Sequence, residues 1–296
     1  MSWIFLSILA AAIFAGVCIS DKFVLANFKC KPVLMLLVSA MVGLVFGLGA
    51  FAWNGFVLIT GGQLLLAFIS SLSFVGMLYF YFKAMELEDV SKVVPLFYIN
   101  PLFILLLAGI FLNESLTIQN YLGVFLLVIG AIFLSFKKSL AFKSRLGFLF
   151  TILSALCIAI NQVILKYLLN FLDYWTVFAY IRISSFVIII PILIYNFADL
   201  KRLFLQKLPA AGLVVLNESF SFLAYLILTF ASGFGAISLI NALMATQPFF
   251  VLLFTLFLSL IYPRVIDEKI KASTFALKFA GVMVMLAGVS LIGSHF

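Results

Sequence analysis

Ten stretches of about 20 mostly apolar residues follow one another along this chain, separated by proline, glycine, asparagine or charged residues. A helix of that length matches the thickness of the hydrocarbon core of a membrane. Hydrophobic residues make up 66% of the chain and charged residues only 9%, whereas soluble domains carry roughly a quarter charged residues. We therefore expect an all-α, polytopic membrane protein with ten transmembrane helices. The expected helices cover residues 3–20, 33–52, 62–82, 93–112, 118–136, 147–168, 175–196, 208–230, 236–261 and 274–293.

The second half of the chain repeats the pattern of the first half about 147 positions later. Asn100-Pro101 in the first half corresponds to Gln247-Pro248 in the second. This correspondence predicts two five-helix repeats, residues 1–140 and 141–296. Because five is an odd number, the second repeat enters the membrane from the opposite side, so the two repeats are inverted. Carriers commonly bind their substrates in the cavity between two such repeats.

The basic residues indicate the orientation. Fifteen of the 18 Lys and Arg residues fall in the first, third, fifth, seventh and ninth loops. By the positive-inside rule these loops are cytoplasmic, so both termini are predicted to face outward from the cell membrane. The net charge of +8 then reflects short loops beside lipid headgroups. We expect membrane lipids, a small-molecule substrate and protons as partners, and no nucleic acid. The protein is expected to be a monomer or homodimer.

The chain offers little for a metal site or a catalytic set. Cys18 and Cys157 lie within apolar stretches, Cys30 lies in a short basic loop, and the single histidine is His295. No His, Cys and carboxylate set has the spacing of metal ligands or of a catalytic triad. We therefore predict no metal, no cofactor, no catalytic residue and no enzymatic activity.

Two charged residues are predicted to lie inside the membrane. Glu218 lies about ten residues into its helix and Arg182 about seven residues into its helix, so both are roughly 10–15 Å deep. A charge at that depth usually faces a partner or a watery cavity. Glu218 can exchange a proton or hold an amine, and Arg182 can hold a carboxylate or phosphate. The alternative is a static ion pair between Arg182 and Glu218 that joins two helices.

Further polar residues extend the candidate substrate- or proton-binding site. Glu218, Ser221 and Tyr225 share one helical face, and Asn217 is the neighbour of Glu218. Pro101 and Pro248 are expected to kink the fourth helix of each repeat, because proline removes a backbone donor. Lys22 and Lys166, near helix ends, are expected to be interfacial anchors. The remaining candidates are amides within helices: Asn100, Asn161, Gln162, Asn241 and Gln247.

A motif in the first half resembles the EamA family of the drug/metabolite transporter superfamily. It consists of Leu112-Asn113-Glu114-Ser115-Leu116-Thr117 with Gln119, Gly123, Gly130-Ala131 and the earlier Pro101. The resemblance implies a ten-helix carrier that works by alternating access. It also implies a central cavity lined by the first four helices of each half.

These observations favour a secondary transporter of a small polar metabolite, such as an amino acid or related zwitterion, with Glu218 as the candidate for proton coupling. An exchanger or flippase for a phosphate-bearing or lipid-linked anion is the alternative within transport. A membrane-embedded transferase is the alternative from another class, but it usually requires His or paired carboxylates near the interface. The repeat positions that differ, such as Ser71 against Glu218, place most of the polar specialisation in the second half.

Overall fold

The computed structural model describes residues 2–28, 31–88, 90–135, 144–206, 208–261 and 272–293, and within these ranges every regular element is an α-helix. The all-α prediction is therefore confirmed for the described residues. The helices are α1 (Ser2–Phe28), α2 (Pro32–Asn54), α3 (Gly61–Leu87), α4 (Val90–Phe97), α5 (Asn100–Phe111), α6 (Ile118–Ser135), α7 (Arg145–Leu169), α8 (Tyr174–Tyr195), α9 (Phe197–Gln206), α10 (Leu208–Phe234), α11 (Ile237–Met244), α12 (Gln247–Ile261) and α13 (Ala272–Gly293).

Eight segments of the described chain are long and apolar enough to cross a membrane: α1, α2, α3, α6, α7, α8, α10, and α11 together with α12. Two further apolar segments, Asn100–Phe111 and Lys278–Gly293, are shorter. The backbone of each long helix satisfies its own hydrogen bonds, which a chain in lipid requires. The protein is therefore a multi-pass membrane protein, while the number of ten spans stays a prediction.

Both segments that contain the repeated prolines are interrupted. The first breaks between Phe97 and Asn100, just before Pro101, and the second breaks between Met244 and Gln247, just before Pro248. Proline lacks the N–H that would bond to the preceding turn. In the first segment the Asn100 side-chain amide donates to the Phe97 carbonyl at 2.9 Å, which satisfies an acceptor that the kink frees.

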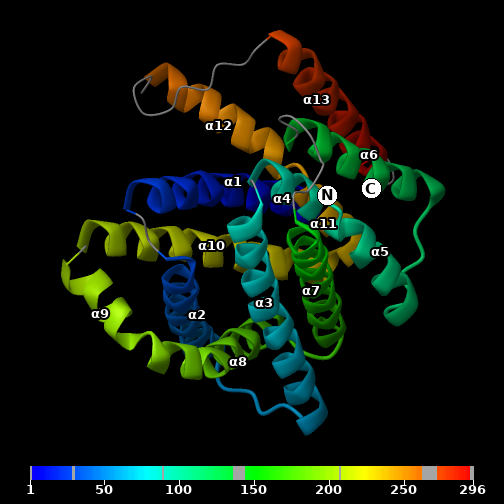
Figure 1. Cartoon of the computed structure of the whole chain (residues 1–296). Coiled ribbons are helices and arrows are strands. Elements are labelled where there is room, and N and C mark those ends of the chain that lie inside the picture. The colour runs from blue at the N-terminus through cyan, green and yellow to red at the C-terminus, as the bar shows by residue number, and fades with distance from the viewer. Residues whose placement is uncertain are drawn as a thin grey trace.

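Helices from the two halves pack together in reciprocal pairs (Figure 1). Helix α1 packs along α10, and α7 packs along α3. Likewise α1 contacts α12, and α7 contacts α5. Helix α2 lies against α8, and α6 lies against α13 at the edge of the bundle. Exchanging the two halves converts the pair α1–α10 into α7–α3 and the pair α1–α12 into α7–α5. The pairs α2–α8 and α6–α13 correspond to themselves.

Helix α9 was not among the expected helices, because it is too short to span a membrane and carries several charges. It connects α8 to α10 (Figure 1), and it buries Leu200 and Leu203 on one face. Asp199 on α9 accepts a hydrogen bond from the Lys31 ammonium at 2.7 Å, just before α2 begins. That contact, between exposed groups, lowers the pKa of Asp199.

Four glycines allow α6 and α13 to pack closely. A Cβ atom added at Gly130 would lie 2.9 Å from the Gly281 carbonyl oxygen, and one added at Gly288 would lie 2.9 Å from the Gly123 carbonyl oxygen. Small residues permit such backbone approach between membrane helices. The recurrence of Gly123 and Gly130 in the first half as Gly281 and Gly288 in the second therefore serves this interface.

We predict that Gly130→Ala destabilises the protein by about 1–3 kcal/mol, because the new methyl group would press against backbone atoms of α13. Gly109→Ala on α5 is the matched control, since a Cβ there meets nothing within 4 Å. Thermal unfolding of the purified variants in detergent measures the difference. Equal unfolding temperatures for the two variants would contradict this account of the interface.

Candidate functional site

Arg182 lies in a cage of aromatic rings at the centre of the bundle. Its side chain extends from α8 and is only 2% exposed. The guanidinium carbon lies 4.4 Å from the ring centre of Phe74 and 4.3 Å from that of Tyr225. The rings of Phe178 and Phe222 lie at 5.6 Å and 5.3 Å. Helices α3, α8 and α10 thus stabilise one cation through the faces of their aromatic residues.

The predicted alternative of an ion pair between Arg182 and Glu218 is wrong for this structure. Among the residues that the structure describes, no carboxylate lies within the 4.0 Å of the Arg182 guanidinium that defines an ion pair. Two guanidinium nitrogens, Nε and Nη1, are buried without a hydrogen-bond partner. Leaving such donors unsatisfied is energetically unfavourable, and the aromatic cage offsets only part of that penalty. A ligand with acceptor oxygens at the guanidinium would reduce this penalty.

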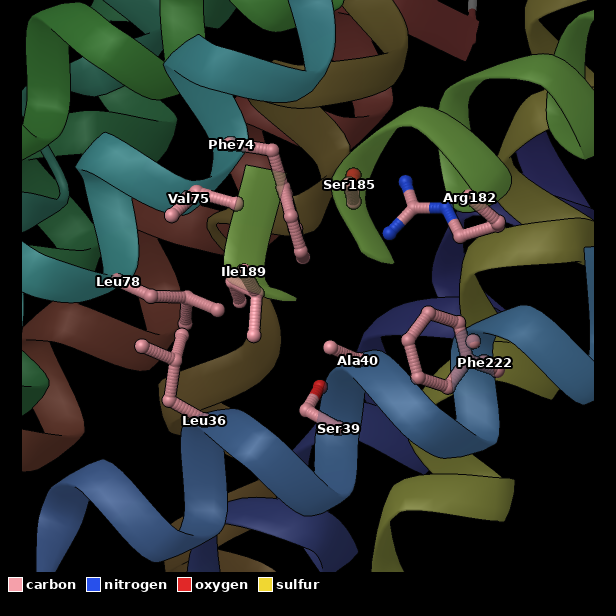
Figure 2. A pocket seen from close by; sticks show the side chains of 11 residues that line it. Leu36, Ser39, Ala40, Phe74, Val75, Leu78, Arg182, Ser185, Ile189 and Phe222 are labelled. Carbon is pink, nitrogen blue, oxygen red and sulfur yellow. The ribbon is translucent and has the colours of Figure 1, made fainter. Parts of the chain in front are cut away.

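The guanidinium points toward a small cavity between α2, α3, α8 and α10 (Figure 2). The cavity has a volume of about 10 Å³, which is room for a single water molecule. The hydroxyls of Ser39 and Ser185 are its other polar groups, and the remaining lining is apolar or glycine. The lining residues are Leu36, Ser39, Ala40, Gly43, Phe74, Val75, Leu78, Arg182, Ser185, Ile189 and Phe222.

Asn161 and Gln162 are brought to Tyr225 by the packing of α7 against α10. The Tyr225 hydroxyl donates to Asn161 Oδ1 at 2.9 Å and lies 3.3 Å from Gln162 Nε2. The Asn161 amide also donates to Ser70 of α3, at 2.8 Å to its hydroxyl and 2.9 Å to its carbonyl. These bonds hold the Tyr225 ring against Arg182. Asn161 and Gln162 therefore position the cage and do not themselves line the cavity.

Glu218 does not line the cavity but lies behind one of its lining residues, Ser39, and close to a second carboxylate, Asp21. The Glu218 carboxyl lies beside the Ser39 hydroxyl and interacts electrostatically with Asp21 of α1. Asn217 Nδ2 donates to Asp21 Oδ1 at 2.6 Å. The site therefore has a cationic end at Arg182 and an acidic end at Asp21 and Glu218, with Ser39 between the acidic end and the cavity.

Asp21 was missed from the sequence because the first helix was expected to end at residue 20. The helix continues to Phe28, so Asp21 lies about two turns inside it. The sequence did contain a signal for the longer helix, since no glycine or proline occurs between Asp21 and Lys31.

The other predicted site residues lie apart from Arg182 or bind their own backbone. The Asn241 amide donates to the Ile237 carbonyl of its own helix at 3.0 Å. The Gln247 side-chain amide donates a hydrogen bond to the Phe14 carbonyl of α1 at 3.2 Å. Ser221 is partly buried on α10, one turn after Glu218. Asn100 caps the first kink, as described above.

Lys166 does not act as the interfacial anchor that its place near a helix end predicted. Its ammonium turns inward and donates to the carbonyls of Ser232 and Gly235, at 2.6 Å and 2.9 Å. These carbonyls belong to the end of α10 and to the turn after it. The other predicted anchor, the Lys22 side chain, lies outside the described residues.

Comparisons with known proteins agree with this architecture. Residues 1–136 match the model of the EamA-like transporter family. A solved structure, described as "Crystal structure of protein", is 16% identical and superimposes with a TM-score of 0.69 over 98% of this chain and 95% of that chain. At this identity the likeness shows a shared fold, and it extends over both halves. No match was found among curated proteins. The resemblance predicted from the sequence is thus confirmed over residues 1–136, which match the EamA-like transporter family.

Proposed function

We propose that the protein is a secondary transporter that moves a small zwitterionic metabolite, such as an amino acid, across the cytoplasmic membrane by alternating access. The observation that carries the proposal is the buried Arg182 guanidinium, which lines a cavity and has no ion-pair partner among the described residues. Its planar fork matches the two oxygens of a carboxylate. A substrate carboxylate would give this unpaired cation the anionic partner that the described part of the protein does not supply.

The acidic end of the site favours a substrate that also carries a positive charge. Glu218 and Asp21 do not line the cavity; they lie behind Ser39, which does, because Glu218 hydrogen-bonds Ser39 and interacts with Asp21. A substrate ammonium group would be attracted to these carboxylates, while its carboxylate binds Arg182. In the low-dielectric interior both interactions are stronger than they would be in water.

The small size of the cavity supports a closed state in the transport cycle that we propose. A volume of about 10 Å³ accommodates one water molecule, whereas ligand pockets commonly measure about 300 Å³ or more. A metabolite therefore fits only after α2, α3, α8 and α10 move apart. We assign the structure to a closed state, which exchanges with states open to either side of the membrane.

The architecture that we propose for this cycle has ten spans in two inverted five-helix repeats, residues 1–140 and 141–296. The reciprocal packing of α1 with α10 and of α7 with α3 supports it. Each interrupted pair, α4 with α5 and α11 with α12, then counts as one span. The basic loops would be cytoplasmic and both termini outside, in accordance with the charge distribution.

The alternative within transport is a phosphate-bearing or lipid-linked anion. Arg182 would also bind a phosphate group. Glu218 and Asp21 favour the zwitterion over that anion, because carboxyl oxygens accept hydrogen bonds from an ammonium group, whereas a phosphate group has no N–H to donate to them.

We expect Arg182→Ala to weaken substrate binding about 30-fold or more, because it removes two charge-assisted hydrogen bonds. A thermal-shift screen of the purified protein against amino acids, polyamines and phosphorylated metabolites identifies a stabilising ligand, and titration of that ligand gives the affinity. Arg145→Ala, at the exposed start of α7, is the matched control and should bind normally. Stabilisation by phosphorylated compounds alone would support the anion carrier instead.

We further expect Glu218→Gln to abolish uptake driven by a pH gradient in proteoliposomes, while exchange of the same substrate across the membrane continues. The amide keeps the shape of the side chain but carries no exchangeable acidic proton. Glu86→Gln, at the exposed end of α3, is the control. Undiminished uptake driven by the gradient in the Glu218→Gln protein would eliminate the proton role of Glu218.

A further inference from the structure

The turn between α10 and α11 is held by side chains from three other parts of the chain. Helix α10 ends at Phe234 and α11 begins at Ile237, so few residues connect them. A helix end leaves backbone carbonyls without partners, and a helix start leaves N–H groups without partners. Both kinds of group therefore occur side by side at this turn, and each needs a partner of the opposite character.

Glu114 provides the partner for the start of α11. Its carboxylate accepts hydrogen bonds from the backbone N–H of Ile237 at 2.8 Å and of Ser238 at 3.3 Å. The Ser238 hydroxyl donates to the same carboxylate at 2.7 Å. A negative charge at a helix N-terminus is stabilised by the helix dipole as well as by these bonds. Glu114 lies in the connection between α5 and α6, about 120 residues away along the chain.

Lys166 provides the partner for the end of α10. Near the end of α7, its ammonium donates to the Ser232 carbonyl at 2.6 Å and the Gly235 carbonyl at 2.9 Å. A positive charge suits the C-terminal end of a helix dipole. Glu114 and Lys166 also attract each other electrostatically. Two opposite charges therefore hold the two helix ends of one turn.

The contacts of Glu114 connect the two halves of the protein. Glu114 precedes the proposed boundary at residue 140, whereas Ser238 and the whole turn follow it. Trp3, at the start of α1, packs against Gly235 so closely that an added Cβ atom there would lie 2.9 Å from the indole. The turn is thus closed against α1 and against the connection after α5, at the membrane side that the charge distribution assigns to the exterior.

We propose that Glu114 and Lys166 form a latch that holds the outer gate of the transporter closed and that must release in every transport cycle. The proposal rests on the alternating-access function proposed above. When the first half moves away from α11, the N–H groups of Ile237 and Ser238 lose Glu114, and water replaces it. The latch thereby sets the balance between the closed state and the state open to the outside.

Distance measurements between two spin labels test the latch without any substrate. The labels are attached at Ile118→Cys, beside the connection that carries Glu114, and at Phe234→Cys, at the end of α10; both positions are exposed. The three native cysteines are first replaced by alanine. We expect Glu114→Ala to raise the ratio of long to short distances about tenfold or more in proteoliposomes, because charge-assisted hydrogen bonds are lost. Lys166→Met should shift the ratio in the same direction but by less, because it removes only the charge that attracts Glu114 across the two halves.

Thr60→Ala is the matched control, since it also removes a helix cap, at the start of α3, but one made within a single half. The distance distribution of the labelled Thr60→Ala protein should equal that of the labelled protein that keeps Glu114 and Lys166. Hydrogen exchange of the peptide spanning residues 236–244 provides a second readout and should become faster in Glu114→Ala. Unchanged distances and unchanged exchange in both latch variants would overturn the proposal. A protein that shows these shifts but transports none of the tested metabolites would instead contradict the proposed function.

Discussion

A guanidinium buried inside a lipid-solvated helical bundle needs compensation, and the centre of this protein is organised around that need. Arg182 is only 2% exposed, and no carboxylate that the structure describes pairs with it. Four aromatic rings from α3, α8 and α10 surround the charge instead. Rings stabilise a cation without neutralising it, so Arg182 keeps its attraction for an anionic ligand. This incomplete compensation distinguishes a binding site from a structural ion pair.

The surrounding structure keeps that cation in place. Asn161 and Gln162 hold the hydroxyl of Tyr225, and Tyr225 in turn stacks on the guanidinium. The close packing of α6 and α13 lies at the edge of the bundle, away from the cage. In the transport cycle that we propose, the paired helices nearer the centre separate to admit a metabolite. At one end of the bundle, Glu114 of the first half binds the start of α11 in the second half.

The sequence predicted the parts of this site that depend on one helix at a time. Arg182 and Glu218 stood out because a charge is rare within an apolar span, and the spans themselves follow from composition. Asp21 was missed because the end of α1 was placed eight residues too early. Lys166 was expected to be an interfacial anchor, because sequence spacing does not reveal that it binds backbone carbonyls at the end of α10 and in the turn that follows. The absence of a pair between Arg182 and Glu218 depends on how α8 and α10 pack, which no local pattern specifies.

The measurement that tests the central claim most directly compares three ligands that differ only at their charged groups. Once a stabilising zwitterion is known, its affinity is measured by calorimetry beside those of its decarboxylated amine and its deaminated acid. If the guanidinium of Arg182 binds the carboxylate, the amine should bind at least about 30-fold more weakly to the unmodified protein, and Arg182→Ala should remove that difference. Equal affinities for the zwitterion and the amine would contradict the account.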